Sequence, residues 1–375
     1  MLLAFAAPIA VFLFRSVANP EIRGALPRTL ARLQDWDGRD LPDERTYAEL
    51  VEDLRAIADS PDLAVLGRRL NYNVTGFRTL VIRTGNRLPA GDVRSYREAL
   101  IAFDARWGDL TYWRTIKAEG GRFTPHYLLS ALDLRRSPEG RIVRAPPETA
   151  LYNALFVRTV WISACVTLLC LLIGSPVAYV MAASPSRISN WLLVLVLLPF
   201  WTSVLVRTTA WVILLQTEGL LNQLLLFLGL RSAPATLIFN RVGLYIAMTH
   251  VLLPFLILPL YSVMRGIPPE LMRAAASLGA DPVTAFRRVY LPQALPGIVA
   301  GSSLVFVIAL GFFITPALVG GPGDQMVGYF IAYFTNESVN WGMGAALGTL
   351  LLAVVAALFI SVGRAIGVER LRVRY

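Results

Sequence analysis

Long apolar runs separated by short polar segments fill the chain from residue 159 onward. One contains 25 residues without a charge, another of equal length contains only Arg207, and the charge-free stretch Val289–Gly323 is too long for one helix. Because about 30 Å of hydrocarbon requires roughly 20 apolar residues in a helix, these runs predict five membrane-spanning helices. They cover Thr159–Ala183, Leu192–Gln216, Val242–Met264, Pro296–Val319 and Gly342–Val362, the fourth being limited by Pro296 and by the glycine cluster at 320–323.

The N-terminus carries a shorter apolar run, Met1–Phe14, which spans only about 21 Å as a helix. A signal peptide is disfavoured because no basic segment precedes the run and Arg15 follows it. We expect an incomplete first span, and an interfacial or re-entrant helix at Gly219–Leu230. The fold class expected is an all-α membrane protein with about six transmembrane helices and a mostly helical extracytoplasmic insert after the first.

Polar residues are concentrated in one block, Ser16–Val157, which holds 40 of the 60 charged side chains. Within it, Tyr47, Leu50, Val51, Leu54 and Ile57 recur at helical spacing and predict one buried helix face. The expected domains are therefore a first helix at 1–15, an extracytoplasmic domain at 16–157 and a five-helix membrane core at 158–375 that contains a cytoplasmic loop at 268–292. A small cap with its own core and no ligand is the simplest interpretation of the second domain.

Composition and motif content argue against several classes of function. The net charge of +10 does not point to nucleic acid, because the polar block is nearly balanced, with 21 basic and 19 acidic residues. The single lysine, Lys117, lies between Ile116 and Ala118, so the chain has no P-loop for ATP. Cys165 and Cys170 both lie in an apolar run, and His250 has no ligand-type residue at metal spacing. We expect no catalytic residue, no metal site and no cofactor in this chain.

The short loops indicate an orientation, because arginine and lysine near span ends are retained in the cytoplasm. With both ends of the chain inside, nine short-loop arginines lie in the cytoplasm and two, Arg231 and Arg241, lie outside. The nine are Arg187, Arg265, Arg273, Arg287, Arg288, Arg364, Arg370, Arg372 and Arg374. The pattern predicts a multi-pass membrane protein with both ends cytoplasmic and 16–157 exported.

One of these loops, Pro268–Pro292, contains the clearest local signals. Pro268 and Pro269 suit a helix start, with Glu270 in the first turn, and Gly279 suits the left-handed position that ends a helix. Asp281 followed by Pro282 predicts the start of a second short helix, Val283–Tyr290. Small residues at the elbow would let another protein approach closely, whereas an ordinary helical hairpin without a partner is the alternative.

This loop resembles the signature of permease subunits of ATP-binding-cassette importers, which reads Glu-Ala-Ala, three residues, Gly, nine residues, Ile, any residue, Leu-Pro. Here Arg273-Ala274-Ala275, Gly279 and Val289-Tyr290-Leu291-Pro292 stand at those spacings. Arg273 replaces the glutamate of the signature, and Glu270, one turn earlier, is the candidate substitute. Three other segments resemble the spermidine/putrescine branch of this family, namely Leu198–Thr208, Leu258–Gly266 and Phe313–Pro322.

The resemblance implies a permease subunit of an ATP-driven importer of the bacterial inner membrane, for polyamines or a related small solute. ATP would then be bound by a partner ATPase that contacts the loop Pro268–Pro292, which we call the coupling loop. It also implies a second permease subunit, with a heterodimer expected, and an extracytoplasmic solute-binding protein. The coupling residues implied are Glu270, Arg273, Ala274, Ala275, Gly279, Asp281, Leu291 and Pro292.

Candidate residues along a solute route are fewer. Arg207 is a charge inside a predicted span, and such charges usually face a cavity or a partner. Glu218, Asp324 and Glu337 stand in predicted outer loops and could attract a cation.

Two functions of other classes remain open. A membrane sensor would require a cytoplasmic output domain, and only short tails and loops are present. An ion-coupled secondary transporter would place ionisable residues or broken helices near the midplane, where Arg207 stands alone.

Overall fold

The computed structural model describes residues 2–87, 94–137 and 141–366, and these residues are mostly helical. The chain divides into two compact units. The first comprises Met1–Asn153 with Ser338–Leu352, and the second comprises Ala154–Glu337 with Ala353–Tyr375. Arg370, Arg372 and Arg374, which contribute to the predicted orientation, lie outside the described residues.

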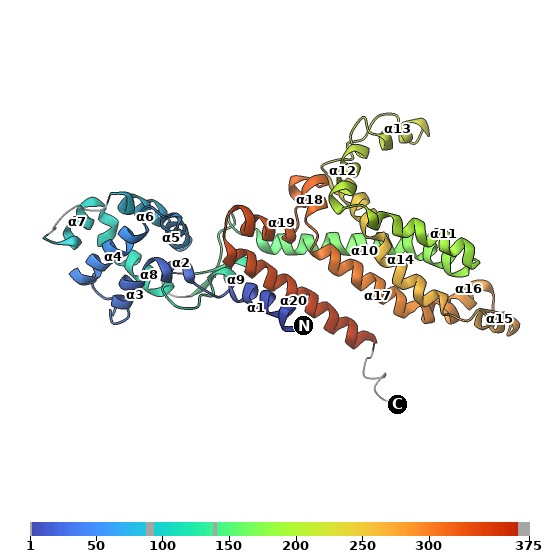
Figure 1. The fold of residues 1–375 in the computed structure, drawn as a ribbon, viewed down its shortest axis with the longest axis horizontal. Coiled ribbons are helices and arrows are strands. Elements are labelled where there is room, and N and C mark those ends of the chain that lie inside the picture. The colour runs from blue at the N-terminus through green and yellow to red at the C-terminus, as the bar shows by residue number, and fades with distance from the viewer. Residues whose placement is uncertain (1, 88–93, 138–140, 367–375) are drawn as a thin grey trace, which may run out of the picture. The chain divides into compact units, whose positions relative to one another are not determined.

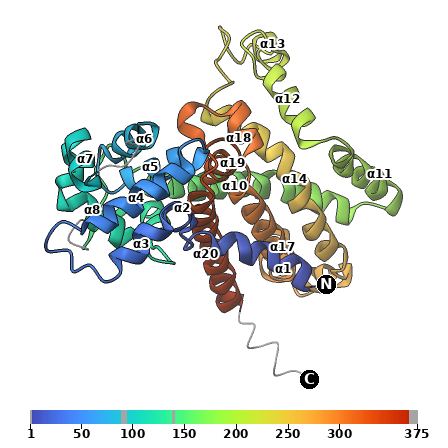
Figure 2. The same ribbon diagram turned by 60° about the vertical axis from the view of Figure 1, so that its left-hand side comes forward.

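The first unit contains short helices and one two-stranded antiparallel hairpin (Figure 1). In chain order these are α1 (Leu2–Phe14), α2 (Pro20–Ala25), α3 (Pro27–Leu33), α4 (Glu44–Ile57), α5 (Pro61–Asn71), α6 (Phe77–Asn86), α7 (Tyr96–Phe103), the 3₁₀ turn Ala105–Gly108, α8 (Leu110–Glu119), α9 (His126–Ala131), β1 (Leu134–Arg136) and β2 (Ile142–Arg144). Helices α2–α8 form a bundle around one hydrophobic core (Figure 2).

Helix α4 shows how sequence and packing agree in this bundle. Its N-cap, Asp43, accepts a hydrogen bond from the backbone N–H of Thr46, which satisfies one of the unpaired amides of the first turn. All five apolar positions predicted to share a face, from Tyr47 to Ile57, are buried in the core. The mostly helical character predicted for the block is confirmed, with the small hairpin as an addition.

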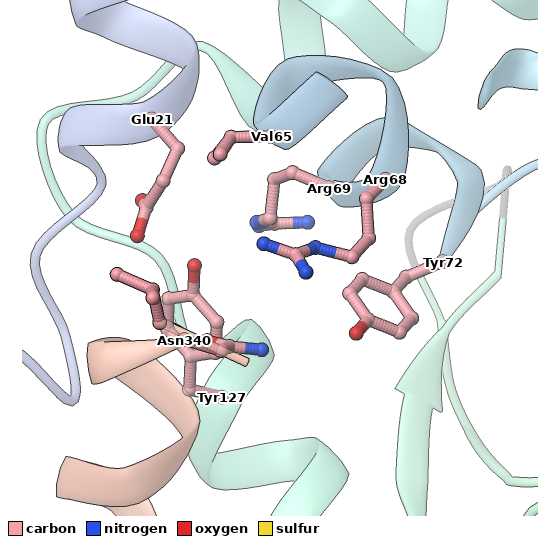
Figure 3. A pocket seen from close by; sticks show the side chains of 8 residues that line it. Glu21, Val65, Arg68, Arg69, Tyr72, Tyr127 and Asn340 are labelled. Atoms are coloured by element: carbon pink, nitrogen blue, oxygen red, sulfur yellow. The ribbon is translucent and has the colours of Figure 1, made fainter. Parts of the chain in front are cut away.

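The same unit buries an ion pair. Nη2 of Arg69 lies 2.6 Å from Oε2 of Glu119, and both side chains are at least nine-tenths buried. Figure 3 shows Arg69 and Arg68 from α5, Glu21 from α2 and Tyr127 from α9 around a cavity of about 10 Å³. That volume suits roughly one water molecule, so the cavity is part of the packing of the bundle.

The second unit holds the long apolar helices. Its elements are α10 (Tyr152–Ala183), α11 (Ser186–Leu197), the 3₁₀ turn Leu198–Trp201, α12 (Val204–Leu214), α13 (Leu220–Phe227), α14 (Arg241–Arg265), α15 (Pro269–Ser277), α16 (Pro282–Ala285), the π-helical turn Phe286–Tyr290, α17 (Leu291–Leu310), α18 (Ile314–Val319), a 3₁₀ turn at Pro322–Asp324, α19 (Val327–Ala332), a second π turn at Tyr333–Glu337 and α20 (Trp341–Ile366). The ends of α10 and α20 extend into the first unit.

Four helices of the described chain are long and apolar enough to cross a membrane. They are Tyr152–Ala183, Arg241–Arg265, Pro282–Leu310 and Trp341–Ser361, and a bent pair adds a fifth if it forms one span. Helix α1 has 13 residues and is not among them, so the count of six remains a prediction. The short helix predicted at Gly219–Leu230 is present as α13.

The prediction of one continuous helix at Leu192–Gln216 is wrong, whereas its assignment as a single span stays a prediction. The chain bends by 96° between Ser186–Trp201 and Val204–Leu214. Ser203 starts the second half as its N-cap, since its hydroxyl accepts a hydrogen bond from the backbone N–H of Val206 at 3.1 Å. Pro199 lies in the 3₁₀ turn that closes the first half.

The predicted boundaries around Pro296 are also wrong. Residues Pro282–Leu310 form one continuous helix, so neither a separate short helix at Val283–Tyr290 nor a span at Pro296–Val319 exists. A π turn, in which the backbone N–H of Leu291 bonds to the carbonyl of Phe286, precedes Pro292. This wider turn accommodates a register change within the helix, which ends instead at Leu310.

Candidate functional site

The loop between α14 and α17 lies at one end of the second unit, beside the ends of those two helices, whereas α12, α13 and α18 lie at the opposite end (Figure 1). Its first helix, α15, begins at Pro269 with Pro268 as its cap and Glu270 in its first turn. This start was predicted from the prolines and is confirmed.

Helix α15 ends in a C-capping motif that depends on Gly279. The backbone N–H of Gly279 bonds to the carbonyl of Ala276 at 3.0 Å, and that of Ala280 bonds to the carbonyl of Ala275 at 3.1 Å. This pair of bonds is the Schellman motif, and it requires the left-handed conformation that Gly279 adopts, with φ of +85°. A Cβ placed on Gly279 meets no atom within 4 Å, so the outer side of the elbow is open.

Asp281 starts the next helix as predicted. Its Oδ1 accepts hydrogen bonds from the backbone N–H groups of Val283 and Thr284, at 3.0 and 3.1 Å. The bonds from Thr284 hold the pKa of the Asp281 carboxyl below its ordinary value, so it stays charged at neutral pH. Two helices thus meet at a rigid elbow of five residues, Ser277–Asp281.

The elbow presents apolar side chains together with a salt bridge. Leu278 is 89% exposed and Val283 is 64% exposed. Beside them, Nη2 of Arg273 lies 2.6 Å from Oε1 of Glu270, with both side chains mostly in solvent. Exposed leucine and valine side chains at the tip of a loop are typical of a surface that another protein covers.

The remaining predicted loop residues divide into exposed and packed positions. Ala274, Leu291 and Pro292 are exposed, whereas Ala275 is buried. Tyr290 is buried and contacts Tyr179 of α10, with ring centroids 5.4 Å apart. The structure therefore brings the predicted residues together in one loop that is anchored on α10.

Arg265, the last residue of α14, adds a second anchor that the sequence analysis assigned only to topology. Its Nη1 donates hydrogen bonds to the carbonyls of Ala182 and Ser184, at 2.9 and 3.0 Å, and its Nη2 donates to Oγ of Ser186 at 3.2 Å. Arg265 thereby ties the turn between α10 and α11 to the residue before the coupling loop. The only sequence signal was its place three residues before Pro268.

The predicted route residues do not form one cluster. Arg207 lies on α12, half-buried, and its Nε has no hydrogen-bond partner among the described residues. The next residue, Thr208, is hydrogen-bonded to Thr315 of α18 at 3.0 Å. Glu218 and Glu337 are exposed.

Asp324 differs from the other two carboxylates because it is buried and paired. Its Oδ1 lies 2.8 Å from Nε of Arg241, and its Oδ2 accepts a hydrogen bond from the backbone N–H of Gly321. Arg158 of α10 donates to the carbonyl of Gly323 at 2.6 Å. Asp324 thus holds the loop after α18 against α14. Sequence reasoning could not find this pair, because its members are 83 residues apart.

Within the residues described, no group of three or more histidine, cysteine, aspartate or glutamate side chains is arranged to hold a metal ion. Both cysteines described, Cys165 and Cys170, are free.

Comparison with known proteins assigns this architecture to a family. The profile of the family described as "Binding-protein-dependent transport system inner membrane component" matches residues 174–373, which include the whole coupling loop. The spermidine/putrescine transport system permease protein PotB of Haemophilus influenzae is 39% identical over 218 residues, covering 57% of this chain and 76% of PotB. PotB of Escherichia coli K12 is 34% identical over 215 residues, covering 57% of this chain and 78% of PotB.

A solved structure of a bacterial alginate ABC transporter, in complex with an alginate pentasaccharide-bound periplasmic protein, contains a similar chain. It is 18% identical, with a TM-score of 0.47, and the match covers 57% of this chain and 79% of that one. From the match over more than half its length and its identity to PotB, the chain belongs to the binding-protein-dependent transport system inner membrane components: it is not an enzyme but a multi-pass permease subunit of an ABC importer, in which a partner ATPase hydrolyses ATP.

Proposed function

We propose that this permease imports polyamines such as putrescine or spermidine, and that the partner ATPase docks on the elbow Ser277–Asp281. The exposed apolar tip at Leu278 is the observation that carries the docking proposal. Helix α15 joins the elbow to α14, and α16 continues through the π turn into α17, so a force on the elbow moves two spans. Similarity to PotB supports the polyamine part.

The coupling role is divided among the loop residues. Gly279 leaves room for the ATPase, Asp281 and Ala275 stabilise the elbow, and Leu291 and Pro292 join it to α17. Glu270 and Arg273 neutralise each other on the exposed side, which limits electrostatic repulsion of a partner of either sign.

The solute route runs past the bend between α11 and α12. Arg207 follows this bend, and Glu218 and Glu337 are the exposed carboxylates that we expect to attract a cation. Asp324 supports the route only through structure, because the charge of its carboxylate is offset by the guanidinium of Arg241. A bare arginine repels a polyamine, so Arg207 acts as a structural or partner-facing residue in this proposal.

Competition for uptake tests the solute. Cells that carry the whole transport system are given labelled putrescine or spermidine together with unlabelled candidates. We expect polyamines to compete and anionic or neutral solutes not to compete. Competition by an anionic or neutral solute in the absence of competition by any polyamine would remove the polyamine assignment and leave the importer assignment intact.

We also propose that both ends of the chain are cytoplasmic and that residues 16–157 are exported. The nine-to-two excess of short-loop arginines supports this orientation. In intact cells lacking Cys165 and Cys170, Ser60→Cys should react with a membrane-impermeant thiol reagent. Ser277→Cys should react only after the inner membrane is opened, and labelling of it from outside would invert the orientation.

The complete importer further requires a second permease subunit, for which we propose a different chain, and a solute-binding protein on the outer side. Membership of a binding-protein-dependent system supports the second partner. Purification of the tagged chain after mild solubilisation, followed by mass spectrometry, tests the composition. Recovery of the tagged permease paired only with itself would exclude the heterodimer.

A further inference from the structure

One polar side chain is exposed near the middle of helix α14, which is long and apolar enough to cross a membrane. Among residues 243–261 of this helix, all of which the structure describes, only His250 is exposed. The 25 residues Arg241–Arg265 have Leu253 at their centre. His250 is therefore about 4.5 Å from the middle of the helix. A polar ring at this depth requires a partner, because lipid chains offer no hydrogen bond.

A hydrogen bond from α12 fixes the proton of this imidazole. Nε1 of Trp211 lies 3.1 Å from Nδ1 of His250 and donates to it, since an indole nitrogen can only donate. Nδ1 is therefore unprotonated, and the neutral ring carries its proton on Nε2. Nε2 makes no hydrogen bond with the residues that the structure describes. His250 thus presents a free N–H donor on the surface of α14.

Arg207 adds a positive charge at a similar depth. It precedes Trp211 by one turn of α12, so both side chains share the face that meets α14. Before the bend, Phe200 packs edge to face on Phe255 of α14, with ring centroids 5.0 Å apart. The segment 200–211 therefore lies along the middle of α14, at least about 13 Å from either end. That distance exceeds the length of an arginine side chain, so Arg207 cannot place its charge among the lipid headgroups.

The chain itself offers no acceptor for these donors. Nε of Arg207 is buried and has no hydrogen-bond partner in the part of the chain that the structure describes. The sequences of the four long helices and of the bent pair contain no aspartate or glutamate. A second copy of this chain would therefore bring another arginine to this depth, but no carboxylate. Charged side chains at mid-depth are costly unless they pair or line a water-filled cavity.

The surroundings of Arg207 and His250 favour a second membrane helix as the partner. Leu205, Val206 and Ile213 of α12 are each more than half exposed. Apolar side chains around a few polar groups are typical of contacts between membrane helices. Lipid phosphates lie too far away, as the depth shows. A polyamine has no acceptor for Arg207, because its protonated amines only donate.

We propose that Arg207 and His250 bind the second permease subunit, whose facing helix supplies an aspartate or glutamate side chain at mid-depth. The carboxylate accepts hydrogen bonds from the guanidinium of Arg207 and from Nε2–H of His250. This inference rests on the proposed cationic solute and on the proposed heterodimer. It deepens the second of these, since a carboxylate at this depth has to come from a different chain.

Charge exchange in the complete importer tests this inference. The tagged chain is expressed with its whole transport system and purified in mild detergent, and quantitative mass spectrometry gives the ratio of second permease subunit to tagged chain. Arg207→Glu should lower this ratio by about tenfold or more, because a like-charge contact replaces a desolvated ion pair. Each aspartate or glutamate in the spans of the second subunit is then changed to lysine. One of these changes should restore the ratio for Arg207→Glu.

Three further variants serve as controls. Arg187→Glu makes the same change of charge at an exposed position of α11 and should leave the ratio unchanged. Arg207→Lys retains the positive charge and should retain most of the second subunit. His250→Phe removes one donor and should lower the ratio by about threefold, the effect of a single hydrogen bond between membrane helices.

Three outcomes would overturn the proposal. An unchanged ratio with Arg207→Glu would do so, and if uptake is lost at the same time, Arg207 belongs to the solute route. A lowered ratio that no lysine substitution restores would mean that Arg207 acts only on the folding of its own chain. A wild-type chain paired only with itself would remove the proposal together with the heterodimer. Because the ratio is measured without solute, a failure of the polyamine assignment is recognised separately, in the competition assay.

Discussion

The two units of this chain are both helical, yet they treat apolar residues in opposite ways. In the bundle α2–α8 of the first unit, Trp107, Trp113 and Tyr47 are buried. In the second unit, residues such as Val157 and Leu172 of the long helix α10 are more than half exposed. A water-facing bundle must bury its apolar side chains, whereas a membrane-facing helix leaves them on its surface. We therefore expect substitutions in the first unit's bundle to act on its stability, and substitutions in the second unit's exposed loop to act on coupling.

The largest effect expected is on the buried ion pair of the first unit. Arg69→Met leaves the Glu119 carboxylate buried without its partner, which should lower the free energy of unfolding of that unit by about 3–5 kcal/mol. Arg273→Met breaks an equally short ion pair in solvent and should cost about 0–1 kcal/mol. Thermal denaturation of both variants in detergent compares the two losses of stability. Equal losses for Arg69→Met and Arg273→Met would contradict the expected difference between the buried and the exposed ion pair.

Arg265 should affect coupling more than folding. Arg265→Met removes three hydrogen bonds between α14 and the turn after α10, so movement of the coupling loop should no longer reach that turn. We expect uptake to fall by about tenfold or more, because hydrogen bonds from charged groups contribute about 1.5–3 kcal/mol each. ATP hydrolysis in proteoliposomes should fall far less. A parallel loss of both activities would indicate that Arg265 only stabilises the fold.

Asp324 distinguishes a structural carboxylate from one that attracts solute. If its role is the ion pair, Asp324→Asn and Arg241→Gln should reduce uptake to similar extents, because each leaves the other charge unpaired. If Asp324 attracts a cation directly, Arg241→Gln should increase uptake instead. Initial rates at low ionic strength decide between these outcomes, since screening is then weakest.

Glu218→Gln and Glu337→Gln serve as exposed comparisons for Asp324. In this proposal the two exposed carboxylates act only by attracting the cationic solute over a distance. We therefore expect each variant to lose about two- to fivefold in polyamine uptake at low ionic strength and almost nothing at high salt. Salt-independent losses would assign these residues another role.

The last effect concerns pH and the first unit. Burial, with the nearby Arg69 charge, holds the pKa of His126 well below its ordinary value of 6.5. The unfolded chain therefore binds a proton that the folded unit excludes, so stability should decrease as pH falls below about 6.5, by at most about 1.4 kcal/mol per pH unit. His126→Gln should flatten this dependence between pH 7 and 5. An unchanged slope would place the titrating group elsewhere.

Features set by neighbouring residues were predictable from the sequence. The start of α15 at the prolines, its stop at Gly279 and the cap at Asp281 all depend on contacts within five residues. The buried face of α4 followed from its spacing. The bend before α12 had a comparable local signal in the Ser203 cap, which an apolar run of 25 residues concealed.

Features set by distant pairs were not predictable. The ion pairs Arg69–Glu119 and Arg241–Asp324 join residues 50 and 83 positions apart, and a single sequence contains no measure of such proximity. The continuous helix through Pro292 depends on a π turn, which has no sequence signature as strong as the proline that follows it. Pro292 and Pro296 both lie inside α17, so neither proline marks a helix boundary here.

The central claim is that the partner ATPase docks on the elbow at Gly279, and two glycine variants test it directly. Gly279 and Gly229 both have positive φ, and a Cβ on either meets no atom within 4 Å. Leucine at either position thus introduces similar backbone strain and a side chain in open space. Co-purification of the ATPase from membranes and solute uptake are measured together for Gly279→Leu and Gly229→Leu, at matched permease levels. We predict that Gly279→Leu loses both and that Gly229→Leu retains both, whereas normal ATPase binding and uptake with Gly279→Leu would contradict the account.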